Sequence, residues 1–140
     1  MASFVKINNF VQDLGRKVHN LNADTIKVML TNSAPNASTS AVKADLTEIS
    51  AGNGYSAGGA LVSSTGWSHT SGVGNLTGTD PVITASGGTI GPFRYAVLYN
   101  STAANGELIG YWDYGSSITL ASGDTFTVDF DATNGVLQLA

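Results

Sequence analysis

Three short segments contain residue types that perform chemistry in other proteins. The first, Gly54–Gly58, matches the G-x-S-x-G elbow that presents the nucleophile of many serine hydrolases. That elbow needs a helix after the serine, whereas residues 59–63 have the composition of a strand. No acidic residue separates Ser56 from His69, and no histidine follows His69. We interpret the match as a chance feature of a loop rich in glycine and serine.

The other two segments concern metal ions. Residues 129–135 resemble a calcium-binding loop, but the required glycine falls one position late and Ala140 replaces the twelfth-position glutamate. The chain contains two histidines, His19 and His69, and no cysteine, so it has no recognisable zinc-ligand spacing. We therefore expect no catalytic residue, no metal site and no cofactor, and predict that the protein is not an enzyme.

Aromatic residues gather near the end of the chain. Six of the twelve lie within 22 residues, on two adjacent predicted strands: Phe93, Tyr95, Tyr99, Tyr111, Trp112 and Tyr114. Such a cluster is compatible with core packing, with a subunit interface or with stacking against a glycan. Arg94 is the only basic residue after Lys43, and we expect it to pair with Asp113 or Asp129.

Strand alternation and turn residues dominate from Thr25 onward. Asn32–Ser40 and Ala51–Gly59 are predicted loops, and Asp80-Pro81 marks residues 76–85 as an edge strand. The pattern predicts an antiparallel β-sandwich, jelly-roll-like, with about eight strands. The predicted segments are Thr25–Thr31, Leu46–Ser50, Ala60–His69, Leu76–Ala85, Phe93–Asn100, Glu107–Tyr114, Ile118–Ala121, Thr125–Asp131 and Val136–Leu139.

The N-terminal segment, residues 1–22, has helical periodicity. Its apolar residues recur at steps of three and four and include Phe4, Ile7, Phe10, Val11, Leu14 and Val18. The spacing predicts one amphipathic helix, which either covers the chain's own sheet or serves as an arm that faces a partner. Gly15 weakens its second half.

Composition and charge limit the classes of protein. The 140 residues suit a single domain, and 42% of them are hydrophobic, which is sufficient for a core. No apolar run is long enough to span a membrane, and residues 1–9 lack the apolar stretch of a secretory signal, so we expect no such signal here. Residues 1–43 hold five bases against two acids, whereas residues 44–140 hold one base against eight acids. An acidic body disfavours nucleic acid, while its basic end suits an acidic protein surface or another copy of the chain.

Two longer strings resemble a family of small structural proteins of tailed bacteriophages. They are residues 24–35 with 45–55, and residues 90–100 with 108–118. Members of that family are described as head-decoration or tail-fibre proteins. The resemblance implies a capsid decoration (cement) protein, made in the cytoplasm of the host bacterium and located on the capsid surface of the virion. Its expected partners are the major capsid protein and further copies of itself, as a dimer or trimer. The alternative is a receptor- or glycan-binding module of a tail fibre.

Two groups of residues are candidates for such contacts. The N-terminal group combines the apolar stripe with the basic pair, and we expect it to act together with loop Asn32–Ser40: Phe4, Ile7, Phe10, Leu14, Arg16 and Lys17. The second group consists of tyrosines on the aromatic strands: Tyr95, Tyr99, Tyr111 and Tyr114. Charge complementarity would set the approach to the partner, and apolar burial would supply most of the affinity.

Overall fold

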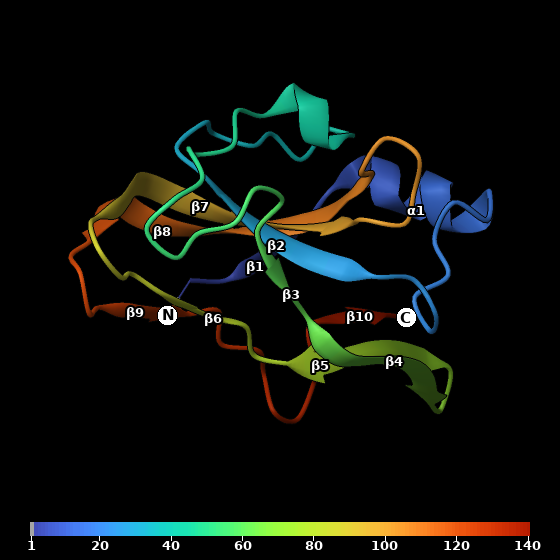
Figure 1. The fold of residues 1–140 in the computed structure, drawn as a ribbon. Helices are drawn as coiled ribbons and strands as arrows, with labels where there is room; N and C mark the ends of the chain where they lie inside the picture. The colour runs from blue at the N-terminus through green and yellow to red at the C-terminus, as the bar shows by residue number, and fades with distance from the viewer. Residues whose placement is uncertain (1) are drawn as a thin grey trace.

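The computed structural model describes residues 2–140, in which every strand pairing is antiparallel. The described chain contains one α-helix, one short 3-10 helix and ten strands (Figure 1). In chain order these are β1 (Phe4–Lys6), α1 (Asn8–Gly15), β2 (Ile26–Thr31), η1 (Lys43–Asp45), β3 (Ala60–Leu61), β4 (Ser63–Thr70), β5 (Val73–Thr79), β6 (Val82–Thr84), β7 (Ile90–Asn100), β8 (Leu108–Leu120), β9 (Thr125–Thr127) and β10 (Leu137–Leu139). The prediction of a mainly antiparallel β fold with one N-terminal helix is confirmed.

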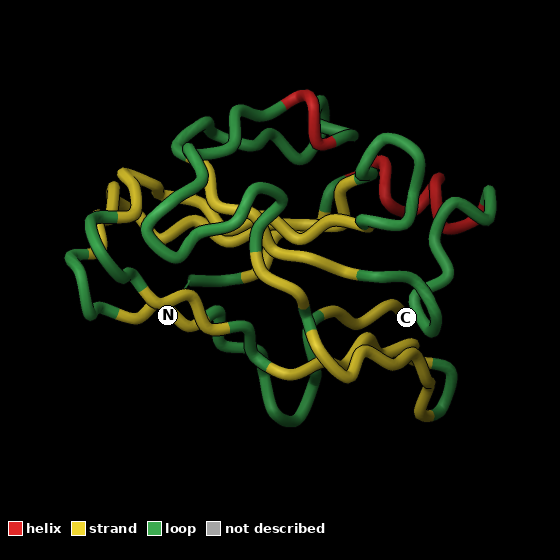
Figure 2. Tube along the Cα trace, in the orientation of Figure 1, coloured by secondary structure: helices red, strands yellow, loops and turns green. Residues whose placement is uncertain are grey.

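A five-stranded sheet of order β1-β8-β7-β2-β3 forms the middle of the molecule. Its central strand β7 is buried on both faces, since every residue from Tyr95 to Asn100 is buried. Helix α1 and the long green loops lie on one side of this sheet, and the smaller sheets lie on the other (Figure 2). The residues of β7 from Tyr95 to Tyr99 are therefore a continuous apolar and aromatic run and do not alternate between apolar and polar.

The layer on the other side consists of a three-stranded sheet, β10-β5-β4, and a two-stranded sheet, β6-β9. Aromatic pairs join this layer to the central sheet. Trp112 stacks on Phe130 with ring centroids 5.8 Å apart, and Phe93 meets Phe126 edge-on at 5.0 Å. Phe126, Val128 and Phe130 occupy alternate positions of the predicted strand Thr125–Asp131 and are all buried, although β9 itself ends at Thr127. The sheets are layered as in a sandwich but remain separate.

The N-terminal helix is shorter than the predicted residues 1–22. Phe4–Lys6 pairs with β8 as a strand, so the apolar spacing before Ile7 reports sheet packing and not helix. The helix ends in a Schellman motif: the Val18 amide donates to Asp13 O and the Lys17 amide to Leu14 O. Lys17 adopts the left-handed conformation with φ of 66°. Gly15, expected to weaken the helix, is its last residue.

Three strand predictions need correction. The predicted strands Glu107–Tyr114 and Ile118–Ala121 are one continuous strand, β8, because Gly115-Ser116 forms a bulge within it and not a break. Strand β5 is the middle strand of its sheet and not an edge; the break at Asp80-Pro81 separates it from β6. Residues 46–50 form no strand and contribute a single bridge from Glu48 to Thr31. None of the described helices is long and apolar enough to cross a membrane.

We predict that Gly59→Ala destabilises the protein far more than Gly87→Ala. Both glycines have a positive φ, so both variants carry the conformational penalty. A Cβ on Gly59 would lie 2.0 Å from the carbonyl oxygen of Val28 and push against β2, whereas Gly87 has open space. Equilibrium urea unfolding should show an additional loss of about 1–3 kcal/mol for Gly59→Ala. Equal losses would contradict the close approach.

Candidate functional site

Helix α1 and loop Asn32–Ser40 form one continuous surface, which we call the N-terminal surface. The amide of Asn8, the first residue of α1, donates to Ala37 O at 2.8 Å, and its side chain contacts Ser38. At the far end of the helix Arg16 and Lys17 are exposed, and neither makes an ion pair with another described residue. Val11, half exposed, adds an apolar side chain between the two ends. The helix and this loop therefore lie against each other.

The inner side of the helix packs within the protein itself. Ile7 and Phe10 are fully buried in the core, and Phe4 and Leu14 are partly buried against it. The side chains of Ile7 and Phe10 are thus not available to a partner in this structure. Of the two alternatives for the apolar stripe, the structure shows a helix that covers its own sheet. Of the residues in the N-terminal group, Arg16 and Lys17 are the exposed ones.

A buried hydrogen-bond hub holds the segment that follows the helix. Asn100, the last residue of β7, has no exposed surface. Its side-chain nitrogen, Nδ2, donates to Asp24 Oδ2 at 2.6 Å and contacts His19 Nδ1 at 3.0 Å. Its side-chain oxygen, Oδ1, accepts hydrogen bonds from the backbone amides of Thr102 and Ala103. The hub ties the chain beyond Lys17 to the loop between β7 and β8.

These partners determine the state of His19. The two backbone amides identify Asn100 Oδ1, so its Nδ2 faces His19, and a side-chain amide nitrogen can only donate. His19 Nδ1 therefore accepts, and Nε2 carries the proton. A second proton on Nδ1 would set two donors against each other. His19 is only 5% exposed, and burial lowers its pKa from 6.5, opposed in part by the charge of Asp13. The hub therefore requires neutral histidine.

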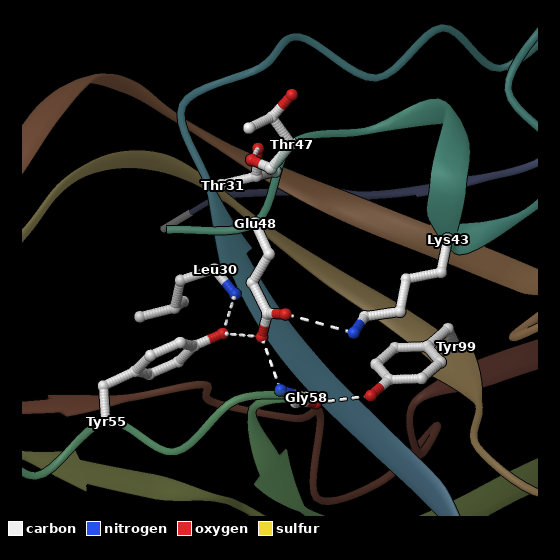
Figure 3. Close-up of polar contacts among 8 residues, drawn as sticks. All are labelled: Leu30, Thr31, Lys43, Thr47, Glu48, Tyr55, Gly58 and Tyr99. Carbon is white, nitrogen blue, oxygen red and sulfur yellow. Dashed lines mark hydrogen bonds and ion pairs between the residues drawn. The ribbon is translucent and has the colours of Figure 1, made fainter. Parts of the chain in front are cut away.

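A second polar cluster, centred on Glu48, holds residues 41–59 over the central sheet (Figure 3). Glu48 Oε1 accepts hydrogen bonds from the Tyr55 hydroxyl and the Gly58 amide, each at 2.7 Å. Its Oε2 pairs with Lys43 Nζ at 3.0 Å. The Tyr55 hydroxyl also accepts from the Leu30 amide of β2. Both carboxylate oxygens are thus engaged in holding the loop.

The phenols of this cluster stay protonated over the neutral range. Burial raises the pKa of Tyr55 well above its usual value, and burial beside Glu48 raises the pKa of Tyr99 to about 12. The Tyr99 hydroxyl donates to the carbonyl of Gly58, and Lys43 lies 5.5 Å from the Tyr99 ring centroid. A shallow pocket of about 620 Å³ beside Lys43 and Glu48 opens to solvent. Its two charges neutralise each other.

The candidate tyrosines divide into two pairs. Tyr95 and Tyr99 are buried, whereas Tyr111 and Tyr114 are half-buried. Tyr95 meets Tyr111 edge-on, and Tyr114 packs on Phe126, so most of the ring surface serves packing. Arg94 forms the expected ion pair with Asp113, at 2.8 and 3.0 Å, which confirms one of the two predicted partners.

No family model, curated protein or solved structure matches this chain.

The rejected motifs occupy ordinary structural positions. Ser56 lies in a turn that leads into β3, so the helix that a nucleophile elbow requires does not follow it. The Asp131 carboxylate accepts the amides of Thr133 and Asn134, which lowers its pKa and caps the turn before β10. Within residues 2–140 no group of three or more His, Cys, Asp or Glu side chains is placed to share a metal ion.

Sequence reasoning missed both polar clusters. A tyrosine inside a glycine-rich loop is a usable signal, because a large aromatic ring there must find a place to bury. The Asn-Ser-Thr sequence that follows a strand likewise suits an asparagine that caps a turn. Nothing in the sequence indicates that Asn100 meets His19, since 81 residues separate them.

We predict that folding stability falls as the pH drops below about 7, through His19. Its folded pKa lies below the unfolded value of about 6.5, so the unfolded chain binds more protons between the two values. The stability that neutral His19 contributes is fully present above the unfolded pKa and is lost as the pH falls toward the folded pKa. Urea unfolding between pH 5 and 7.5 measures it.

The matched variants are His19→Asn, whose side-chain oxygen replaces Nδ1 as an acceptor, and His69→Asn on exposed β4. We expect His19→Asn to flatten the pH dependence in this range and His69→Asn to retain it. The opposite pattern would contradict the assigned role of His19.

We predict a graded loss of stability among variants of the Glu48 cluster. Glu48→Ala leaves the Tyr55 hydroxyl and the Gly58 amide without their hydrogen-bond acceptor. It should reduce the free energy of unfolding by about 2–4 kcal/mol. Glu48→Gln keeps the acceptor oxygen, and Lys43→Met keeps the aliphatic stem, so each should cost about 1 kcal/mol. Hydrogen exchange of amides 51–59 provides a local measurement. A Lys43→Met loss as large as that of Glu48→Ala would contradict this ranking.

Proposed function

We propose that this chain is a structural protein of a phage virion, a decoration protein that binds the capsid shell and associates with copies of itself. The observation that carries the proposal is the exposed Arg16-Lys17 pair, presented at a capped helix end on an otherwise acidic chain. The resemblance of residues 24–35, 45–55, 90–100 and 108–118 to phage structural proteins supports it. The partner on the shell is an acidic surface of the major capsid protein.

The chemistry of the N-terminal surface suits this task. Exposed unpaired bases steer an acidic partner into contact at long range, and this steering weakens with added salt. Affinity comes from apolar and backbone contacts, for which Val11 and loop Asn32–Ser40 are available. The hub at Asn100 and the Schellman motif hold the surface in place before binding, so little ordering entropy is lost on contact.

Neutralising the basic pair should weaken attachment to the shell. We expect Arg16→Gln/Lys17→Gln to bind purified particles at least tenfold more weakly at low salt. Both positions are exposed, so the variant should fold as the wild type does. A deletion of the N-terminus is unsuitable, because Ile7 and Phe10 belong to the core.

The matched control changes net charge equally at the other end of the molecule. Thr119→Glu/Thr127→Glu adds two charges at exposed sites, one next to the last residue of β8 and one on β9, whose label lies on the opposite side of Figure 1 from α1. It should bind particles normally in a co-sedimentation assay. If both double variants bound particles equally weakly, the assignment of binding to the N-terminal surface would be wrong. Hundreds of copies per particle support shell decoration, whereas a dozen or fewer would assign the protein to a tail fibre.

A further inference from the structure

The edge strands of the described chain differ greatly in length. The edges of the central sheet are β1 and β3, with three and two residues. Strands β6, β9 and β10 each have three residues. Strand β4 is the exception, with eight residues and a partner, β5, on one side alone. Figure 1 shows no strand beyond it. Short edges offer little backbone to another chain, whereas a long edge is a template for pairing.

Strand β4 also lacks the usual protection of an edge. Its sequence, S-S-T-G-W-S-H-T, contains no proline and no Lys, Arg, Asp or Glu. The irregular pairing is confined to its first half, between Ser63 and Gly66. From Gly66 to Thr70 the ladder with β5 is regular. Five consecutive residues thus present an undistorted, uncharged edge.

The hairpin turn determines which backbone groups point outward. Ser71 and Gly72 form a two-residue turn with positive φ at both positions, which makes Thr70–Val73 a hydrogen-bonded pair. Because such pairs alternate along an antiparallel ladder, the N–H and C=O groups of Trp67 and His69 face away from β5. These two residues offer two donors and two acceptors at the free edge.

We propose that β4 pairs antiparallel with β4 of a second copy, about a two-fold axis at Ser68. Trp67 of each copy then exchanges both backbone hydrogen bonds with His69 of the other, and a six-stranded sheet forms across the two molecules. The free groups are two residues apart, the spacing that reciprocal pairing requires. This register is the one that uses all five regular residues in both copies.

A second copy fits this edge better than an unrelated strand because the edge is complementary to itself. Two acidic chains repel each other, but β4 brings no charged side chain to the axis. The inference deepens the self-association in the proposed function and rests on it. Four backbone hydrogen bonds give weak pairing in dilute solution, so cysteine trapping is the appropriate measurement.

This register predicts a specific pattern of disulfide cross-links between the two copies. Ser68 would face Ser68 of the second copy in a non-hydrogen-bonded pair, with Cα atoms about 4.5 Å apart, and Gly66 would face Thr70. The native chain has no cysteine, and Ser68 is exposed, so Ser68→Cys adds a single accessible thiol. We expect Ser68→Cys to form disulfide-linked dimers under mild oxidation at least tenfold faster than Thr70→Cys alone.

A mixture of Gly66→Cys and Thr70→Cys should form the mixed dimer in preference to either homodimer. Gly66 tolerates the change, because an added Cβ meets only Thr77 Oγ1, at 3.4 Å. Ser68→Cys linking no faster than Thr70→Cys would overturn the proposed register. Preferred links in a different pattern would overturn it equally.

Charge variants test the interface at equilibrium. Ser68→Lys and Ser68→Glu should each sediment as monomers at concentrations where the wild type dimerises, and an equimolar mixture should dimerise again. A wild-type protein that stays monomeric up to millimolar concentration would overturn the proposal. These measurements use purified protein without particles. Normal particle binding by Arg16→Gln/Lys17→Gln would therefore count against the proposed function alone, whereas failure of the cysteine trapping would count against the β4 pairing alone.

Discussion

The burial of β7 on both faces is the constraint on which the rest of the structure depends. A strand whose residues from Tyr95 to Asn100 are all buried needs a cover on each side of its sheet. The two smaller sheets cover one side through the aromatic pairs of Phe126 and Phe130. The other side is covered by α1 and by residues 41–59, which have little regular structure of their own. This irregular cover must therefore be held by specific hydrogen bonds.

That requirement explains how the few charged residues are used. Glu48 and Lys43 hold the loop over β2, Asp24 supports Asn100 and its turn, and Arg94 pairs with Asp113 across β7 and β8. Arg16 and Lys17 have no comparable structural task in the described chain, although cations at a helix C-terminus are favourable. In a protein with 11% charged residues, an exposed basic pair without a structural task is the clearest feature of its surface.

Local signals predicted the parts of the fold that depend on neighbours in sequence. Alternation identified β2 and β7 within a few residues, and the predicted gap between Asn100 and Glu107 coincides with the loop between β7 and β8. The helix was predicted too long because Phe4 satisfies helical spacing and strand pairing equally well. Gly115-Ser116 has turn composition, but pairing with β7 on both sides absorbs it as a bulge. The hub at Asn100 and the Glu48 cluster arise from contacts between distant segments, which no local pattern encodes.

The two proposed surfaces lie next to each other on one rigid body. Trp67 of β4 lines a small pocket together with Lys17 and His19, so the free edge adjoins the end of the N-terminal surface. A copy held on a shell by Arg16 and Lys17 would present β4 in a fixed orientation beside its neighbours. Tethering of this kind replaces dilute encounter by a high effective concentration, which strengthens a weak contact without new interactions. Pairing that is weak in dilute solution would then become stable on the particle, where each contact reinforces the other.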